Sequence, residues 1–229
     1  MATRFHLADG TTNTPPVSPA FDAGWEQTGQ ATRRNLVRAG SESLAATDVS
    51  GTITVPITTT QDILCRQFVS LPIWAPVNIS GTLNFACGAT ESATTANVQF
   101  ALVVKVFSND GNTVRGTLLS NFAVDTEFAT TGLSSNRILN AGAITALTTQ
   151  PGDRLVVEIG AHAAAPTAAT SYTVNFQNNS PPDVALTTAI NGGLNNPWIE
   201  FSCDIGQFTD NNREFVKAGD GMSVSEKIR

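Results

Sequence analysis

The chain has 229 residues, of which 41% are hydrophobic and only 14% are charged, with a formal net charge of -6 and a sequence pI of about 4.8. This length and apolar content suffice for one large domain, while the few charges leave a surface rich in Thr, Ser and Asn. The acidic balance argues against general nucleic-acid binding, which needs a basic stripe to displace counterions. No apolar run is long enough to span a bilayer, and the first residues lack the apolar region of a signal peptide.

Residues 1–49 are predicted to form an extended N-terminal arm. Prolines and glycines punctuate this stretch, and its apolar residues occur singly rather than with a regular period. The large side chains of Phe21 and Trp25 would be a liability if they were exposed. Two interpretations are open: the arm packs back over its own domain, or it docks on a neighbouring subunit. A short helix is also expected around residues 35–46.

The second interpretation gives specific roles to residues of the arm. Burial of one large apolar side chain contributes about 1.5–3 kcal/mol, so Phe21 and Trp25 would act as interface anchors. Arginine suits the rim of an interface, because its planar guanidinium group pairs with carboxylates. The predicted rim consists of Arg33, Arg34 and Arg38. The arm would then act across a subunit boundary.

The clearest strand signal lies in residues 152–162, GDRLVVEIGAH, which follow a Pro-Gly turn signal. Apolar and polar residues alternate along this stretch with a period of two, the pattern of a strand that has one face on a core. Glu158 and His162 fall on the face that we expect to point toward water. The face expected on the core carries Leu155, Val157, Ile159 and Ala161.

Residues 97–108 form the most apolar strand signal of the chain and are expected to be a central strand. Both faces are apolar apart from Gln99 and Lys105, as in a strand that is covered on both sides. The sequence Asn-Asp-Gly-Asn at 109–112 signals a turn, after which residues 113–124 are expected to return as the partner strand. Further strands are expected at 52–58, 63–69, 79–87, 138–148, 172–176 and 198–205.

About eight or nine short strands, without a convincing long helix, predict an all-β fold of two packed antiparallel sheets. Among the Greek-key topologies of such sandwiches, we favour a jelly roll. Residues 206–229 change to mixed charge and are interpreted as a C-terminal arm, with a short helix over 210–218. The predicted organisation is therefore an extended N-terminal arm at 1–49, a jelly-roll-like sandwich at 50–205 and a C-terminal arm at 206–229.

The sequence offers few residues for catalysis or metal binding. His6 and His162 are expected to be solvated surface residues, because a zinc site needs more ligands at closer spacing. Asp125 and Glu127 form an acidic i, i+2 pair, and without supporting residues we expect solvated acids rather than a calcium or glycosidase site. We therefore expect no enzyme activity, no cofactor and no bound metal.

Two other residue types have both a structural and a functional interpretation. Trp74 and Trp198 could form a sugar-stacking platform, although packing under the long loop or the arm is the simpler interpretation. Cys87 and Cys203 share faces with apolar neighbours and are expected to be small core residues. Because no leader is evident and the cysteine count is odd, we expect reduced thiols.

Three parts of the chain carry recognisable sequence patterns: RFHLADG…PPVSPAFDAGWEQT at the start, QPGDRLVVEIGAHA in the middle and NPWIEFS near the end. These stretches resemble virion structural proteins of tailed bacteriophages. The resemblance covers residues 1–205 and contains no catalytic signature. It implies a jelly-roll-like particle protein that is made in the bacterial host cytoplasm and assembled into the virion. Its partners would be copies of itself and other virion proteins, such as a major capsid protein or a tail or collar protein.

The first functional hypothesis is a capsid decoration or cement subunit, anchored by its arms, with no direct contact to nucleic acid or membrane. The alternative is a tail, collar or fibre subunit that binds host-surface glycan, which would need exposed aromatic residues in a concave site. An enzyme acting on glycan has the least support, because no nucleophile elbow or supported carboxylate pair is evident.

Overall fold

A computed structural model of the chain describes residues 2–7, 14–38, 59–124, 127–128, 130, 136–164, 170–176, 183 and 196–205. Within these residues the protein is all-β and has no helix. None of the described residues therefore forms a helix that could cross a membrane. The strands are β1 (Thr3–His6), β2 (Thr32–Arg38), β3 (Gln61–Ser70), β4 (Asn78–Ile79), β5 (Thr82–Glu91), β6 (Val98–Phe107), β7 (Val114–Val124), β8 (Asn136–Ala143), β9 (Leu147–Thr148), β10 (Arg154–Ala163), β11 (Tyr172–Asn175) and β12 (Trp198–Phe201).

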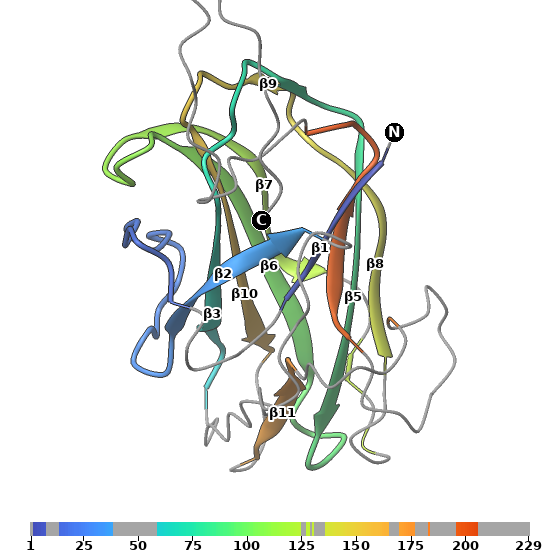
Figure 1. Ribbon diagram of the computed structural model, residues 1–229. Coiled ribbons are helices and arrows are strands. Elements are labelled where there is room, and N and C mark those ends of the chain that lie inside the picture. Colours follow the sequence, from blue (N-terminus) through green and yellow to red (C-terminus); the bar gives the residue numbers. More distant parts are fainter. Residues whose placement is uncertain are drawn as a thin grey trace, which may run out of the picture.

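The strands form a sandwich of two layers (Figure 1). One layer has the order β2-β3-β10-β6-β7, and the other contains β1, β12 and β5, with β8 and β11 both paired to β5. Strand β2 joins the layers, because its first five residues pair with β3 and its last two pair with β1. The small pair β4–β9 lies outside this main sheet. The prediction of an all-β, two-sheet sandwich is confirmed.

The pairing of β2 with β3 is parallel, whereas the other pairs of named strands are antiparallel. The predicted purely antiparallel arrangement is therefore corrected at this pair. A parallel pair needs a crossover of about a dozen residues or more, and the stretch from Arg38 to Gln61 provides that length.

The centre of the larger layer is formed by β10 and β6, which pair along their whole length. The predicted core face of β10 is confirmed, since all four of its apolar residues belong to the main core cluster. Strand β6 is buried on both faces: Phe100 and Leu102 lie in the main core, whereas Ala101 and Val103 lie in a second cluster with Trp25. The prediction of a central strand covered on both sides is also confirmed.

The described part of the predicted N-terminal arm is built into this sandwich. Strand β1 pairs with β12, and residues 17–31, which we call the strap, cover the outer face of the larger layer through contacts with β3, β6 and β10. These segments differ from an extended arm: β1 pairs with β12, and the strap buries the outer face of the larger layer. Residues 35–38 of the expected helix belong to β2. The rest of that helix, the expected strand at 52–58 and the C-terminal arm lie outside the described residues.

Candidate functional site

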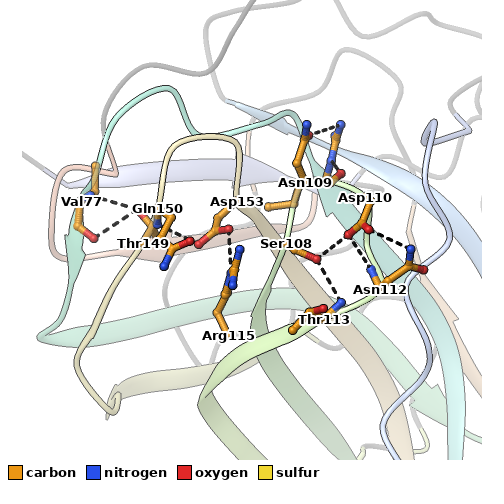
Figure 2. Close-up of polar contacts among 11 residues, drawn as sticks. Val77, Ser108, Asn109, Asp110, Asn112, Thr113, Arg115, Thr149, Gln150 and Asp153 are labelled. Atoms are coloured by element: carbon orange, nitrogen blue, oxygen red, sulfur yellow. Dashed lines mark hydrogen bonds and ion pairs between the residues drawn. The ribbon is translucent and has the colours of Figure 1, made fainter.

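Three connections meet at one end of the sandwich because their strands are neighbours in the sheet. Arg154, the first residue of β10, is paired with Phe107, the last residue of β6, so the turn before β10 lies beside the turn after β6. Ile73 joins this pair: its amide donates to the carbonyl of Asp153 at 2.7 Å, and its carbonyl accepts from the amide of Gly152 at 2.7 Å. Residues 71–77, 108–115 and 149–153 together form what we call the loop end, part of which is drawn in Figure 2.

The turn between β6 and β7 is organised by the carboxylate of Asp110. It accepts hydrogen bonds from Ser108 Oγ at 2.5 Å, from the Asn112 amide at 3.1 Å and from Asn112 Nδ2 at 2.9 Å. The Ser108 hydroxyl and then the two Asn112 groups lower the pKa of Asp110 to about 2. Gly111 adopts a φ of 75°, which a residue without Cβ tolerates. The predicted turn is confirmed, and it holds an exposed, ionised carboxylate in a fixed place.

Arg115, near the start of β7, is oriented by a buried carboxylate (Figure 2). Its Nε donates to Asp153 Oδ1 at 3.1 Å, and Asp153 is only 1% exposed. The other oxygen, Asp153 Oδ2, accepts from the Gln150 amide at 2.8 Å. The Arg115 side chain is 35% exposed, and its Nη groups have no partner among the described residues. The guanidinium is therefore held by one edge and keeps its outer edge available.

Arg154 fixes the other side of the same turn. Its Nε and Nη2 donate to the carbonyl of Asn109 at 2.7 Å and to Asn109 Oδ1 at 3.2 Å, and its Nη1 donates to the carbonyl of Ser70 at 3.0 Å. Burial lowers the pKa of Arg154, but an arginine starts so high that the group stays charged at neutral pH. Its positive charge is thus enclosed by neutral oxygens beneath the loop end.

An open groove of about 620 Å³ lies between these residues. Pockets that take small molecules usually measure about 300–1,000 Å³ and combine apolar walls with a few placed polar groups. Fixed acceptors and fixed donors stand in the same groove, and the strap adds one apolar side chain. Its lining consists of Val17, Ser108, Asn109, Asp110, Thr113, Arg115 and Arg154.

Two large hydrophobic side chains are exposed in the part of the chain that the structure describes, and both belong to the loop end. Trp74 is 46% exposed and Val114 is 48% exposed. Trp74 directly follows Ile73, which is bonded to the turn before β10, and Val114 stands between two lining residues of the groove. Exposed apolar groups beside a polar groove are typical of a contact surface.

Of the two interpretations of Trp74 and Trp198, packing under the arm describes Trp198, so the two residues do not form a sugar platform together. Trp198 lies on β12 with 1% exposure and packs against Ala86. The guanidinium of Arg4, on the neighbouring strand β1, covers its ring at 3.9 Å from the ring centroid. No sugar can stack on a ring that its own chain covers, and Trp74 differs from Trp198 in being 46% exposed.

The predicted anchors Phe21 and Trp25 pack on their own chain. Trp25 is 6% exposed and meets the ring of Phe122 edge-on, with 4.8 Å between the ring centroids. Phe21 is partly buried beside it, and the guanidinium of Arg33 lies 4.1 Å from the Phe21 ring centroid. The prediction of docking on a neighbour is therefore corrected for these two side chains. The alternative interpretation, packing over the same domain, describes them.

The predicted arginine rim is bonded within the chain as well. Arg33 Nε donates to Gln67 Oε1 at 2.9 Å. Arg34 Nη1 donates to the carbonyl of Arg33 at 2.9 Å, and Arg38 forms an ion pair with Asp204 at 3.9 Å. All three arginines belong to β2, so their backbone and side chains serve the sheet rather than a free arm.

Glu158 is the point at which the strap is attached to β10. It was expected to face water but is 1% exposed, because the strap covers that face. Its carboxylate accepts from Trp25 Nε1 at 2.6 Å, from Gln67 Nε2 at 2.8 Å and from the amide of Asp22 at 3.1 Å. Burial raises the pKa of Glu158, although these donors and the Lys105 ammonium partly oppose the rise. Lys105 itself forms an ion pair with Asp22.

Both histidines have a carboxylate partner, which differs from the expected solvated state. His6 Nε2 lies 2.9 Å from Asp183 Oδ1, and His162 Nδ1 lies 2.7 Å from Asp62 Oδ1. Their side chains are 16% and 21% exposed. Within the described residues, no group of three or more His, Cys, Asp or Glu side chains could hold a metal ion.

The remaining predicted residues show no shared site. Cys65 and Cys87 are fully buried, Cys203 is partly buried against the main core, and none of the three is in a disulfide. The expected core position of Cys87 is confirmed. Glu127 is exposed, and its predicted partner Asp125 lies outside the described residues.

The sequence reasoning did not identify Arg115, Asp153 and Arg154 as site residues. It treated residues 109–112 as a plain turn and Arg154 as part of a solvent face. The available signal was the predicted antiparallel order of two long strands. If β6 and β10 pair, the turn that ends one must lie beside the turn that begins the other, and their polar residues meet.

No protein-family model matches the sequence, and no curated protein matches it. Among solved structures, the chain is similar over 88% of its length to a CocE/NonD family hydrolase from Staphylococcus aureus, with 9% identity and a TM-score of 0.44, and it spans 36% of that chain. It is also similar to Eiger TNF from S. frugiperda over 81% of this chain and 98% of that one, with 14% identity and a TM-score of 0.26. A structure of infectious bursal disease virus, Gx strain, matches 82% of this chain and 40% of its own, with 12% identity and a TM-score of 0.27. Likenesses this weak carry no argument about function.

Proposed function

We propose that this chain is a structural subunit of a bacteriophage virion, and specifically a capsid decoration or cement protein. The starting point is the resemblance of three sequence stretches to virion structural proteins. The observation that carries the proposal is that these stretches, far apart in the sequence, contact one another in the fold.

The first contact closes the smaller layer. The RFHLADG stretch contains β1 and the NPWIEFS stretch contains β12, and the two strands pair with Phe5 opposite Ile199 and His6 opposite Trp198. The rings of Phe5 and Phe201 also meet edge-on, with 6.1 Å between their centroids. Two of the stretches that resemble virion proteins thus hold the two ends of the domain together.

The second contact closes the larger layer. The PPVSPAFDAGWEQT stretch contains residues 17–28 of the strap, and its Trp25 and Asp22 bond to Glu158 in the GDRLVVEIGAH stretch. The stretches that resemble virion proteins are also the ones that hold the two layers together. This supports a protein with a structural role. Residues kept for such a task are packing and pairing residues, not catalytic groups.

The partners of such a subunit would be other virion proteins and copies of itself. Because Trp25 and the arginines of β2 are bonded within the chain, these contacts would use other surfaces. The loop end is the best candidate, since Trp74 and Val114 expose apolar groups there. The subunit would be made in the bacterial host cytoplasm and then assembled into the virion.

The proposal is tested by purifying particles of the phage that encodes the chain through a density gradient. Mass spectrometry is expected to find the chain at a fixed copy number, and an electron-microscopy map is expected to show its sandwich on the head. Absence of the chain from infectious particles would refute the proposal. A second candidate, a tail, collar or fibre subunit that binds glycan, is favoured by the exposure of Trp74 beside the groove, and the same map would place it on the tail.

A further inference from the structure

We infer that the groove at the loop end is a carbohydrate site, and that its ligand is a neutral, hydroxyl-rich sugar. A capsid decoration subunit needs no sugar site, so this inference goes beyond that proposal; it deepens the second candidate, a glycan-binding subunit, by naming the site and the ligand class. It rests on a fixed carboxylate and on a guanidinium whose outer edge has no partner among the described residues, both of which line the groove, and on an exposed indole at the same loop end. The ligand class follows from how these groups are held.

The groove contains both hydrogen-bond acceptors and hydrogen-bond donors. The Asp110 carboxylate has about four acceptor positions and uses three of them on Ser108 and Asn112. Arg115 uses its Nε on Asp153 and leaves its Nη groups for a ligand. A sugar hydroxyl can donate to the carboxylate and accept from the guanidinium. Since the protein itself fixes both groups, little side-chain freedom is lost when a ligand binds.

The charges of the groove favour a neutral ligand. Arg115 and Arg154 supply two positive charges, and Asp110 and Asp153 supply two negative ones. An acidic sugar or a phosphate would meet the exposed Asp110 carboxylate, and a cation would meet the Arg115 guanidinium. Juxtaposed like charges oppose binding, so the balanced groove selects against both kinds of ion.

An apolar surface for a sugar ring is present at the same end. Trp74, 46% exposed, follows Ile73, whose backbone bonds to Gly152 and Asp153, and Asp153 in turn holds Arg115. A pyranose ring has an apolar C–H face that packs on an indole, while its hydroxyls reach polar groups beside it. Val17 contributes a further apolar edge of the groove.

The test is a glycan array of neutral and acidic oligosaccharides probed with the full chain, followed by calorimetric titration of each sugar that binds. We expect binding to neutral oligosaccharides. Trp74→Ala and Asp110→Asn should each weaken that binding about tenfold or more, which is the usual effect of removing a main contact. Arg115→Lys should also weaken it, because lysine keeps a charge for Asp153 but loses the outer edge. The melting temperature of each variant shows that the fold is retained.

Glu127→Gln is the matched control for Asp110→Asn. Glu127 is an exposed carboxylate beside Phe128, whose amide bonds to the carbonyl of Val98 at the opposite end of β6 from the groove. Its loss should leave sugar binding unchanged. The inference is overturned if no neutral oligosaccharide binds, if only acidic glycans bind, or if Trp74→Ala and Asp110→Asn bind as the wild type does. Absence of the chain from particles would refute the virion proposal and leave a positive sugar result intact.

Discussion

The indole Nε1 of Trp25 donates a 2.6 Å hydrogen bond to Glu158 Oε2, and 133 positions of chain separate the two residues. This contact seats the strap on the outer face of β10. It converts a face that would otherwise be open to water into a second buried layer, in which Leu64, Ala101 and Val103 pack around the indole. The strap is therefore held by a buried polar contact inside an apolar cluster, together with the ion pair of Asp22 with Lys105 and the backbone bonds of Glu26 and Gln27 to Asp62.

Replacement of Trp25 by Phe is expected to destabilise the protein by about 1.5–3 kcal/mol, the usual range for a hydrogen bond to a charged group. Phenylalanine keeps an aromatic ring in the cluster but removes the Nε1 donor, so the buried Glu158 carboxylate loses one of its partners. The free energy of unfolding is measured by urea denaturation with fluorescence and circular dichroism as probes.

Trp74→Phe is the control for this substitution, because Trp74 is 46% exposed. Its effect on the free energy of unfolding should stay within about 0.5 kcal/mol, as for most surface substitutions. Equal denaturation midpoints for wild type and Trp25→Phe would show that the strap does not need this bond.

The pKa of Glu158 is expected to lie above its ordinary value, and the pKa of Asp110 below its ordinary value. Burial raises the pKa of Glu158 above 4.5, and the Ser108 and Asn112 donors lower the pKa of Asp110 to about 2. Glu158 therefore contributes stability that is fully present below its ordinary pKa and is lost as the pH rises through its folded pKa. Asp110 contributes stability that is present above its ordinary pKa and is lost as the pH falls through about 2.

Carboxyl-carbon NMR of labelled protein between about pH 1 and 8 covers both midpoints. The two carboxyls serve as controls for each other, since one is buried and the other is exposed. A Glu158 midpoint at or below 4.5 would contradict the expected rise and would mean that its hydrogen-bond donors and Lys105 outweigh the effect of burial.

Hydrophobic periodicity was sufficient to predict the inward faces of the sandwich. Leu155 and Ile159 repeat every second residue and fall in the main core, and the two apolar faces of β6 correctly indicated a strand covered on both sides. Which face of a strand is apolar depends on the sequence of that strand alone, so its own periodicity can predict it.

The outer faces were not predictable in the same way. Glu158 alternates with core residues and was assigned to water, but Trp25 covers it from a segment far away in the sequence. A pattern along one strand does not record which distant segment lies over it. The same limit applies to the groove, where Asp110 and Arg115 come together with Asp153 and Arg154 only once β6 and β10 are paired.

The three thiols are expected to react in a defined order. Burial raises the pKa of Cys65 to about 11 and also raises that of Cys87, and both side chains are fully buried. Because the thiolate is the reacting form, these two cysteines should react with a thiol reagent only when the domain unfolds, whereas the partly buried Cys203 should react first. Mass spectrometry of the native protein after timed labelling gives the order. Early modification of Cys65 or Cys87 would mean that the core opens locally.

Gly160→Ala is expected to disrupt the seating of the strap. Gly160 lies where the pairing of β10 with β3 shifts register, and a Cβ at this position would overlap the carbonyl oxygen of Ile63 and the ring of Trp25. Since the first obstacle is backbone, relief would require a shift of β3 or expulsion of the indole, at a cost of about 1–3 kcal/mol or more. Gly29→Ala is the matched control, because a Cβ at Gly29 meets nothing within 4 Å. Urea denaturation should show a clear loss of stability for Gly160→Ala and almost none for Gly29→Ala. Equal stability of the two variants would mean that the Trp25 ring does not pack against Gly160 of β10.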